Sequence, residues 1–166
     1  MIIVHNVVVD GYRIENMDKL QKQVLEFHKK FNIPHRDHLS IPEQDELLFR
    51  SSLIVEEVGE FIKASSQENI HDMADALVDI LYVVYGTANT LGLDLEPVFD
   101  EIHRSNMTKS QKATGNTKTW YKKFKAIKGS EYSSPELFEI LKAQMTKNIH
   151  NGNPYVSHPT EGRKYD

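Results

Sequence analysis

Apolar residues recur at helical spacing through most of the chain and are densest in two stretches near its middle. From 53 to 62 and from 77 to 84, almost every position that is not acidic is apolar. Each stretch is therefore predicted to lie in a helix that is apolar nearly all round, and helices of that kind are expected to be buried. Because the connection between the two stretches is short, we expect them to pack as an antiparallel hairpin.

Start and stop signals place further elements around this hairpin. The Ile and Val residues of segment 2–9 predict a short strand. In the helix after Pro97, we expect Val98, Ile102 and Phe99 to face the core. The predicted helix boundaries, from cap to stop, are Asn16 to Pro34, Pro42–Glu43 to about Ser65, Asn69 to Leu91–Gly92, Asp94 to the basic run near 109, and Ser134–Glu136 onward.

The two halves of the chain differ in regularity. Segment 110–134 is rich in Lys, Thr, Gly and Asn, and its imperfect alternation predicts a short strand or hairpin. Residues after 151 offer little to bury. We therefore predict an all-α protein, a four- to five-helix bundle with a short N-terminal strand and an irregular basic C-terminal segment. It forms one domain over residues 1–150, with its core at 17–109, followed by a tail at 151–166.

Acidic residues interrupt the two apolar stretches at helical spacing. Glu56, Glu57 and Glu60 lie in the first, and Asp75 and Asp79 lie in the second, with Asp72 one turn earlier. Residues three and four apart share one side of a helix, so the hairpin is expected to bring these carboxylates face to face.

Electrostatics makes a cation the natural partner of such a cluster. Two carboxylates about 5 Å apart repel by roughly 3 kcal/mol at an effective dielectric constant near 20. An all-oxygen ligand set without cysteine favours Mg²⁺, or Mn²⁺, over zinc. The competing interpretation is a solvated acidic face, which the apolar surroundings disfavour. Asp72 has a second competing role, since an acid in the first turn of a helix is favourable there.

These motifs resemble those of the all-α nucleotide pyrophosphohydrolases, the MazG-like and phosphoribosyl-ATP pyrophosphohydrolase-like group. The resemblance spans roughly residues 47–135. Its signature, E-E-x-x-E followed by E-x-x-D, is matched by the three glutamates and Asp79. The glutamate of E-x-x-D would fall at Ala76, which cannot bind a metal, so Asp75 or Asp72 is expected to supply the missing oxygen.

The resemblance implies hydrolysis of a nucleoside triphosphate between the α and β phosphates, giving the monophosphate and pyrophosphate. On this assignment Glu56 orients or deprotonates the attacking water. The implied metal ligands are Glu57, Glu60, Asp79 and Asp75. The implied substrate contacts are Asn106, Lys109 and, as a weaker candidate, Arg104, for which a basic helix C-terminus is the competing explanation.

Two alternatives stay open at the level of sequence. Phosphoribosyl-ATP could be the substrate, because base and ribose contacts come from variable loops and neighbouring subunits. The chain could also be a non-enzymatic helical bundle that keeps a structural metal, and the lost glutamate at Ala76 would be its first sign.

Composition narrows the remaining classes. The net charge of −4 argues against a nucleic-acid binder, although segment 102–130 carries eight Lys or Arg and no acid. Without a basic, cleavable leader or a membrane-length apolar run, we expect a cytoplasmic protein and no membrane partner. His28, His35 and His38 lack a ligand-like pattern and are expected at the surface. Excess apolar helix surface predicts that the chain pairs with at least one copy of itself. The resemblance implies a homodimer or homotetramer.

Overall fold

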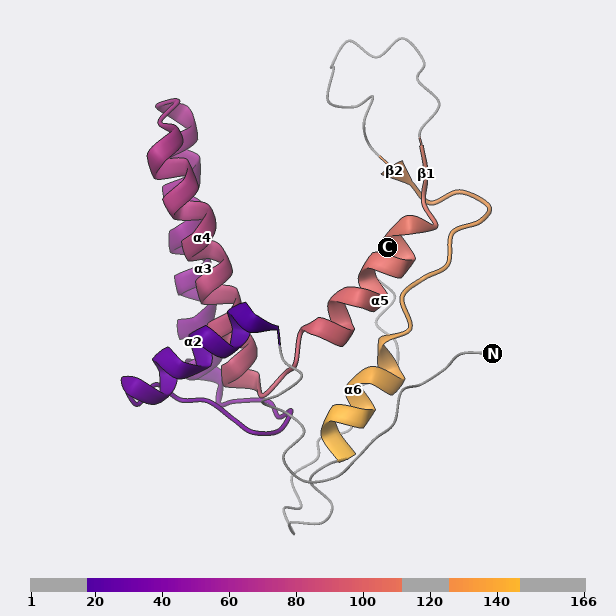
Figure 1. Cartoon of the computed structure of the whole chain (residues 1–166), viewed down its shortest axis with the longest axis horizontal. Helices are drawn as coiled ribbons and strands as arrows, with labels where there is room; N and C mark the ends of the chain where they lie inside the picture. Colours follow the sequence, from indigo (N-terminus) through magenta and orange to yellow (C-terminus); the bar gives the residue numbers. More distant parts are fainter. Residues whose placement is uncertain (1–17, 112–125, 147–166) are drawn as a thin grey trace.

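The computed structural model describes residues 18–111 and 126–146 of the chain, and these residues form five helices and one small sheet (Figure 1). The all-α class is confirmed. The predicted strand at 2–9, the cap at Asn16 and the tail at 151–166 lie outside the described residues. The helices are α2 (Lys19–Lys30), α3 (Gln44–Ser66), α4 (Ile70–Leu91), α5 (Glu96–Met107) and α6 (Leu137–Thr146).

The predicted hairpin is present as α3 and α4, two long helices that pack side by side (Figure 1). Asn69 caps α4 as expected, because its side chain accepts hydrogen bonds from the backbone N–H groups of His71 and Asp72. Gly92 ends α4 at a left-handed φ of 68°, which a glycine adopts without strain. Small buried side chains, Ala64 on α3 and Ala76 on α4, accompany the close approach of the two helices.

Helix α2 packs against α4 and carries a buried amide that joins three elements. Asp18 caps α2 by accepting from the backbone N–H of Leu20. One turn later, Gln21 is fully buried. Its Nε2 donates to Asn89 Oδ1 on α4 at 3.1 Å, and its Oε1 accepts from the backbone N–H of Leu95 at 3.2 Å. This side chain therefore fixes both α4 and the start of α5 to α2.

Helix α5 leaves the end of α4 at a bend of 118° and does not continue along the hairpin. Leu95 occupies its N-cap position, whereas Asp94 was the predicted cap. Asp94 still accepts a hydrogen bond from the backbone N–H of Glu96 at 3.2 Å. Two hydrogen bonds join this corner to α6. The backbone N–H of Asp94 donates to Gln144 Oε1, and Gln144 Nε2 donates to the backbone carbonyl of Asp94.

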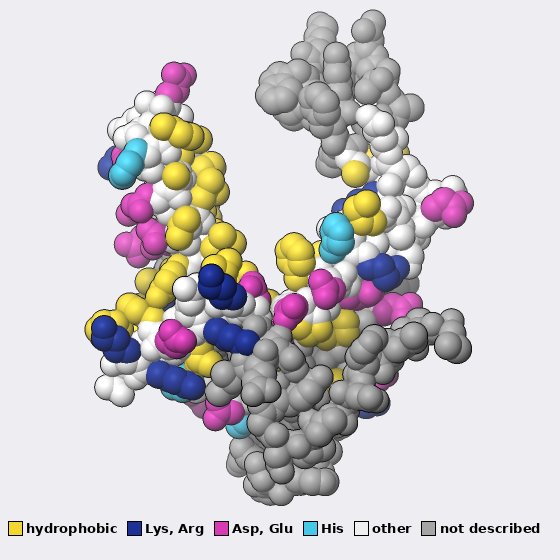
Figure 2. All heavy atoms as spheres, in the orientation of Figure 1, with side chains coloured by type: hydrophobic (Ala, Val, Ile, Leu, Met, Phe, Trp, Pro, Cys, Tyr) yellow, Lys and Arg dark blue, Asp and Glu magenta, His cyan; other side chains and the backbone are white. Residues whose placement is uncertain are grey.

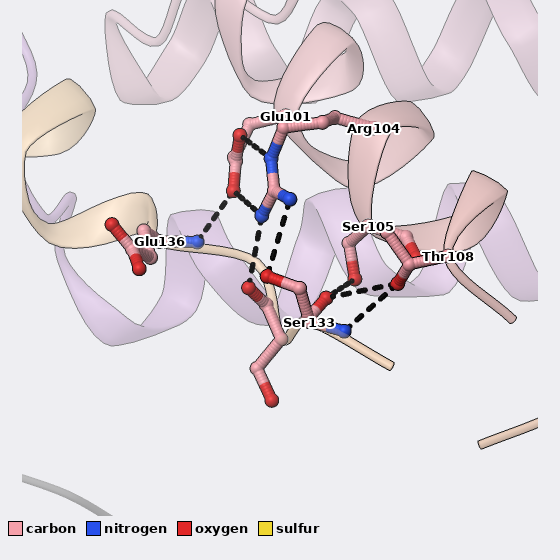
Figure 3. A network of polar contacts seen from close by, with 7 residues as sticks. Glu101, Arg104, Ser105, Thr108, Ser133 and Glu136 are labelled. Atoms are coloured by element: carbon pink, nitrogen blue, oxygen red, sulfur yellow. Dashed lines mark hydrogen bonds and ion pairs between the residues drawn. The ribbon is translucent and has the colours of Figure 1, made fainter. Parts of the chain in front are cut away.

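A polar network on α5 holds the segment that leads into α6 (Figure 3). Arg104 donates to both carboxylate oxygens of Glu101, at 2.7 and 2.8 Å, and also to Ser133 Oγ at 3.2 Å. Glu101 accepts in addition from the backbone N–H of Glu136 at 2.7 Å. These bonds hold the pKa of Glu101 at about 2, well below the ordinary value, with the Arg104 hydrogen bonds as the main cause.

The predicted hairpin after α5 is confirmed in outline. Strands β1 (Ser110–Gln111) and β2 (Ala126–Ile127) pair antiparallel, with Ser110 opposite Ile127. The intervening lysine-rich and aromatic residues lie outside the described part of the chain.

The expectation that both hairpin helices are buried is wrong for the single chain. Val55 on α3 and Val78 on α4 are 70% and 60% exposed, and Phe99 on α5, predicted to face the core, is 70% exposed. Ile102 is exposed as well. The reason is geometric, because α5 turns away and leaves one side of the hairpin uncovered. Figure 2 shows hydrophobic side chains along the edge that faces α5 and acidic side chains along the opposite edge.

Within the described residues, no single helix is long and apolar enough to span a membrane. Helices α4 and α5 pass that test together, across their bend, by length and composition alone.

Candidate functional site

The five predicted site carboxylates lie on the middle of the α3–α4 hairpin. Glu56, Glu57 and Glu60 come from α3, and Asp75 and Asp79 come from α4. Glu57 and Asp79 are half-buried where the two helices meet, whereas the other three are exposed. The predicted meeting of acids across the hairpin is thus present, although the cluster is more open to solvent than the apolar sequence pattern suggested.

Glu57 is the electrostatic centre of this group. Partial burial raises its pKa above the ordinary value, and the negative charges of Asp79, Glu60, Glu56 and Asp75 raise it further. The four neighbours come from both helices, so a positive charge placed beside Glu57 would relieve repulsion from both sides at once.

The donor chemistry of the cluster fits a hard divalent cation, since every candidate ligand is a carboxylate oxygen. In the described ranges, no three acidic or histidine side chains converge closely enough to form a metal site as they stand. The exposed side chains of Glu60 and Asp75 form no ion pair with any described basic residue. The cluster therefore fits a divalent cation through its carboxylate oxygen donors and its concentrated negative charge.

The position that departs from the signature, Ala76, is 3% exposed. Asp75, the next residue, is exposed. It lies four residues before Asp79 and so shares its side of α4. Asp72 lies in the first turn, with its carboxylate 3.3 Å from His71 Nδ1. Asp75 is therefore better placed than Asp72 to supplement Glu57 and Asp79.

The predicted substrate residues lie on or just after α5, and the single chain does not bring them to the acidic cluster. Asn106 is exposed near the end of α5, and Lys109 follows it before β1. Helix α5 points away from the α3–α4 hairpin (Figure 1), and it does not pack extensively against α3. Arg104, the weaker candidate, already uses its guanidinium to bind Glu101 and the segment before α6.

Comparison with known proteins identifies the family of this chain. A family model described as phosphoribosyl-ATP pyrophosphohydrolase matches residues 24–106, half of the 166-residue chain. The chain belongs to the phosphoribosyl-ATP pyrophosphohydrolase family. Membership supports a nucleotide pyrophosphohydrolase type of function, and the hydrolases of this family are usually metal-dependent.

One relative is the uncharacterized protein L479 of Acanthamoeba polyphaga mimivirus. It is 37% identical over 75 residues, which make up 43% of this chain and 30% of the relative. The chain therefore spans less than a third of the length of that viral protein. The shared stretch is shorter than the family match.

Sequence reasoning missed a second polar group in this member of the pyrophosphohydrolase family. Arg50 on α3 is 6% exposed, and His28 on α2, expected at the surface, is 2% exposed. Both line a pocket of about 240 Å³ between α2, α3 and α4. A signal was present, because Arg50 is a cation just before the apolar stretch 53–62 and lies seven residues before Glu57, on the same side of the helix. For His28 the local sequence held no such signal.

Proposed function

We propose that this protein is a Mg²⁺-dependent nucleoside triphosphate pyrophosphohydrolase. It cleaves the anhydride between the α and β phosphates and releases a nucleoside monophosphate and pyrophosphate. The observation that supports this most is the clustering of four acidic side chains around the half-buried Glu57, in a chain of the pyrophosphohydrolase family. A polyphosphate carries dense negative charge, so an acidic site can receive it only with a cation between the two.

In this proposal Glu57, Glu60 and Asp79 hold the cation, and Asp75 supplies the oxygen that Ala76 lacks. Mn²⁺ can replace Mg²⁺, because both favour oxygen ligands. When bound, the cation offsets the charge of the phosphate oxygens and acidifies water. The protein contributes a rigid pair of long helices that fixes the carboxylates relative to one another.

Glu56 is the proposed catalytic residue. It is exposed on α3 next to Glu57, and it has no ion pair with a described basic residue. It is therefore available to orient the attacking water and to accept its proton. Breaking the anhydride then leaves pyrophosphate as the departing group.

The substrate side of the site is proposed to come from a second copy of the chain. Asn106 and Lys109 are separated from Glu57 within one chain, and both the hairpin and α5 expose large apolar side chains. In a homodimer or homotetramer, a second copy would bring its Lys109 to the phosphates at the acidic edge, and contacts between copies would cover the apolar edge of the hairpin. Burying these faces also removes apolar surface from water, at about 25 cal/mol per Å².

Phosphoribosyl-ATP is a second candidate substrate, favoured by the description of the matching family. Its hydrolysis breaks the same α–β anhydride, so the roles of Glu56 and Glu57 would be unchanged. The two candidates differ only in what surrounds the phosphates.

Steady-state kinetics of charge-neutral variants tests the proposed roles. Glu57→Gln and Asp79→Asn keep the side-chain shape but remove a ligand charge, so pyrophosphate release should fall by about 100-fold or more. Asp75→Asn should be nearly as damaging. Glu26→Gln, which removes an exposed acid on α2, serves as the matched control and should keep wild-type turnover.

Mixing inactive variants tests the shared site. Glu57→Gln and Lys109→Ala should each be inactive alone, yet their one-to-one mixture should recover about a quarter of wild-type activity as subunits exchange in a two-fold dimer. Half of the dimers then contain both chains, and one of their two sites is intact. A mixture that stays inactive, although light scattering shows mixed oligomers, would place both residues in the same chain's site. If all carboxylate variants retain wild-type activity, the proposed site is misplaced. If the wild type itself releases no pyrophosphate but is stabilised by Mg²⁺, the non-enzymatic bundle with its structural metal becomes the better description.

A further inference from the structure

The pocket between α2, α3 and α4 has a polar corner and aromatic walls. Its volume is about 240 Å³, below the 300–1,000 Å³ of pockets that enclose whole drug-sized ligands, so it suits a single planar ring system. Phe27 from α2, Phe49 from α3 and Tyr82 from α4 provide the aromatic surface. Phe27 and Tyr82 meet edge to face, with ring centroids 5.5 Å apart.

Arg50 brings a buried positive charge to this pocket. Its Nη2 donates to the carbonyl of Val83 at 2.9 Å, and its Nε lies 3.3 Å from Thr87 Oγ1. No carboxylate among the described residues pairs with it, and Glu46, the acid that most affects its charge, is bound at both oxygens by Arg36. A guanidinium has five N–H donors, so Arg50 keeps unused donors beside the cavity.

His28 adds a hydrogen-bond acceptor to the same corner. Its Nδ1 lies 3.2 Å from the carbonyl oxygen of Pro34, which can only accept, so Nδ1 carries the hydrogen. Burial lowers the pKa of His28, and the charge of Arg50 lowers it further, so the imidazole is neutral. Nε2 of a neutral ring protonated at Nδ1 is an acceptor. His28 Nε2 and the Arg50 guanidinium both lie close to Gly86 on α4, on the side where another residue would carry its Cβ.

The pocket lies on the same side of the hairpin as the acidic cluster. On α3, Glu57 follows Arg50 by seven residues, which is two helical turns or about 10 Å. On α4, Asp75, Asp79 and Tyr82 follow one another at spacings of four and three, which places them in one stripe. The distance of about 10 Å along α3 between Arg50 and Glu57 is comparable to the distance from the base of a nucleotide to its α phosphate.

We propose that this pocket takes the base of the nucleotide and selects bases that present a carbonyl oxygen beside a ring N–H. Arg50 donates to the carbonyl oxygen, and His28 Nε2 accepts from the ring N–H. Uracil, thymine, guanine and hypoxanthine have this edge. The inference rests on the proposed function, because it supplies the base site for the phosphates held near Glu57.

The same corner disfavours the other common bases. Cytosine and adenine present an amino donor where the favoured bases present a carbonyl oxygen. An amino group would face the donors of Arg50, and a ring nitrogen acceptor would face the acceptor of His28. A hydrogen bond to a charged group is worth enough that UTP should exceed CTP in kcat/KM by roughly 10- to 100-fold.

A panel of nucleoside triphosphates with a rim variant tests the base site. Phe49 is 57% exposed at the edge of the pocket, so Phe49→Ala can remove its ring without opening the core. Base–aromatic stacking of the usual strength predicts a roughly 5- to 50-fold rise in KM for UTP with kcat unchanged. The matched control is Leu48→Ala, the exposed neighbour on α3 that does not line the pocket.

Arg50→Gln tests selectivity directly and should bring the UTP and CTP values of kcat/KM within about threefold of each other. Should that variant fail to fold, Phe49→Ala and calorimetric titration of the wild type with UMP and CMP still decide the matter. UMP is expected to bind at least tenfold more tightly than CMP.

The outcomes separate the two proposals. Equal turnover of UTP and CTP by the wild type, or equal KM changes in the Phe49 and Leu48 variants, overturns the base site and leaves the pyrophosphohydrolase intact. A change of molar mass in Phe49→Ala without a change of KM also overturns it, since a second copy would then cover the pocket. If no nucleotide releases pyrophosphate but UMP is preferred over CMP, the base site stands and the reaction is wrong. If neither UMP nor CMP binds, the base site is wrong.

Discussion

Replacing Glu57 with Gln separates a metal-binding cluster from a merely structural one, because the two roles predict opposite changes in stability. The substitution keeps the side-chain shape and removes one negative charge from the centre of the acidic group. Without metal, the variant should be more stable than the wild type, since repulsion from its four acidic neighbours disappears. A structural ion pair would give the reverse sign.

The size of the effect follows from the surroundings of Glu57. Like charges at neighbouring positions on a helix surface destabilise by about 0.2–0.5 kcal/mol for each pair. Four neighbours, partly screened by solvent, therefore sum to about 1 kcal/mol. For a chain of this length, that corresponds to a rise in melting temperature of about 2–4 °C.

Thermal melts in chelator and in excess Mg²⁺ measure both halves of the prediction. The wild type should gain about 2.7 kcal/mol, or roughly 5–10 °C, when Mg²⁺ exceeds its dissociation constant 100-fold. Glu57→Gln should lose most of that gain. Glu26→Gln removes the same charge from α2 and should behave as the wild type does. A variant less stable than the wild type in chelator, together with a wild type indifferent to Mg²⁺, would refute the reasoning.

Three further predictions concern the frame around the site. Gln21→Leu leaves the buried partners of Gln21 unpaired and should destabilise the fold by about 2–4 kcal/mol, measured by denaturant unfolding. Gly86→Ala should destabilise by about 1–2 kcal/mol in the same assay, because a methyl group there displaces the Arg50 guanidinium from its carbonyl partner, and this outweighs the helix propensity of Ala. The pKa of Glu101, about 2, lies below its ordinary value. The Glu101 carboxylate therefore contributes its full stabilisation above about pH 4.5, and this contribution is lost as the pH falls toward 2. The difference in melting temperature between wild type and Glu101→Gln should accordingly shrink between pH 6 and pH 3.

The elements that depend on neighbouring residues could be predicted from the sequence. Asn69 and Gly92 mark the ends of α4 correctly, because a cap and a left-handed stop are local geometry. The closeness of Glu57 and Asp79 across the hairpin could be predicted from helical spacing and the short connection between the two helices. These features need no knowledge of what packs elsewhere.

The features that depend on distant residues could not be predicted in this way. The 118° bend before α5 leaves Phe99 exposed, and no local pattern distinguishes a side chain that packs within the chain from one that awaits a partner. The burial of His28 depends on the approach of Arg50 and Gly86 from two other helices. The pocket between α2, α3 and α4 is for the same reason visible only in three dimensions.

Cleavage of the α–β anhydride of a nucleotide by this protein is tested most directly by ³¹P NMR of the products. UTP, CTP and phosphoribosyl-ATP would each be incubated with the wild type and Glu57→Gln, with Mg²⁺ and with chelator. We expect the wild type with Mg²⁺ to form UMP and pyrophosphate from UTP, and we expect these products to be lost in the variant or in chelator. Formation of UDP and phosphate, or no turnover of any of the three substrates with Mg²⁺ or Mn²⁺, would contradict it.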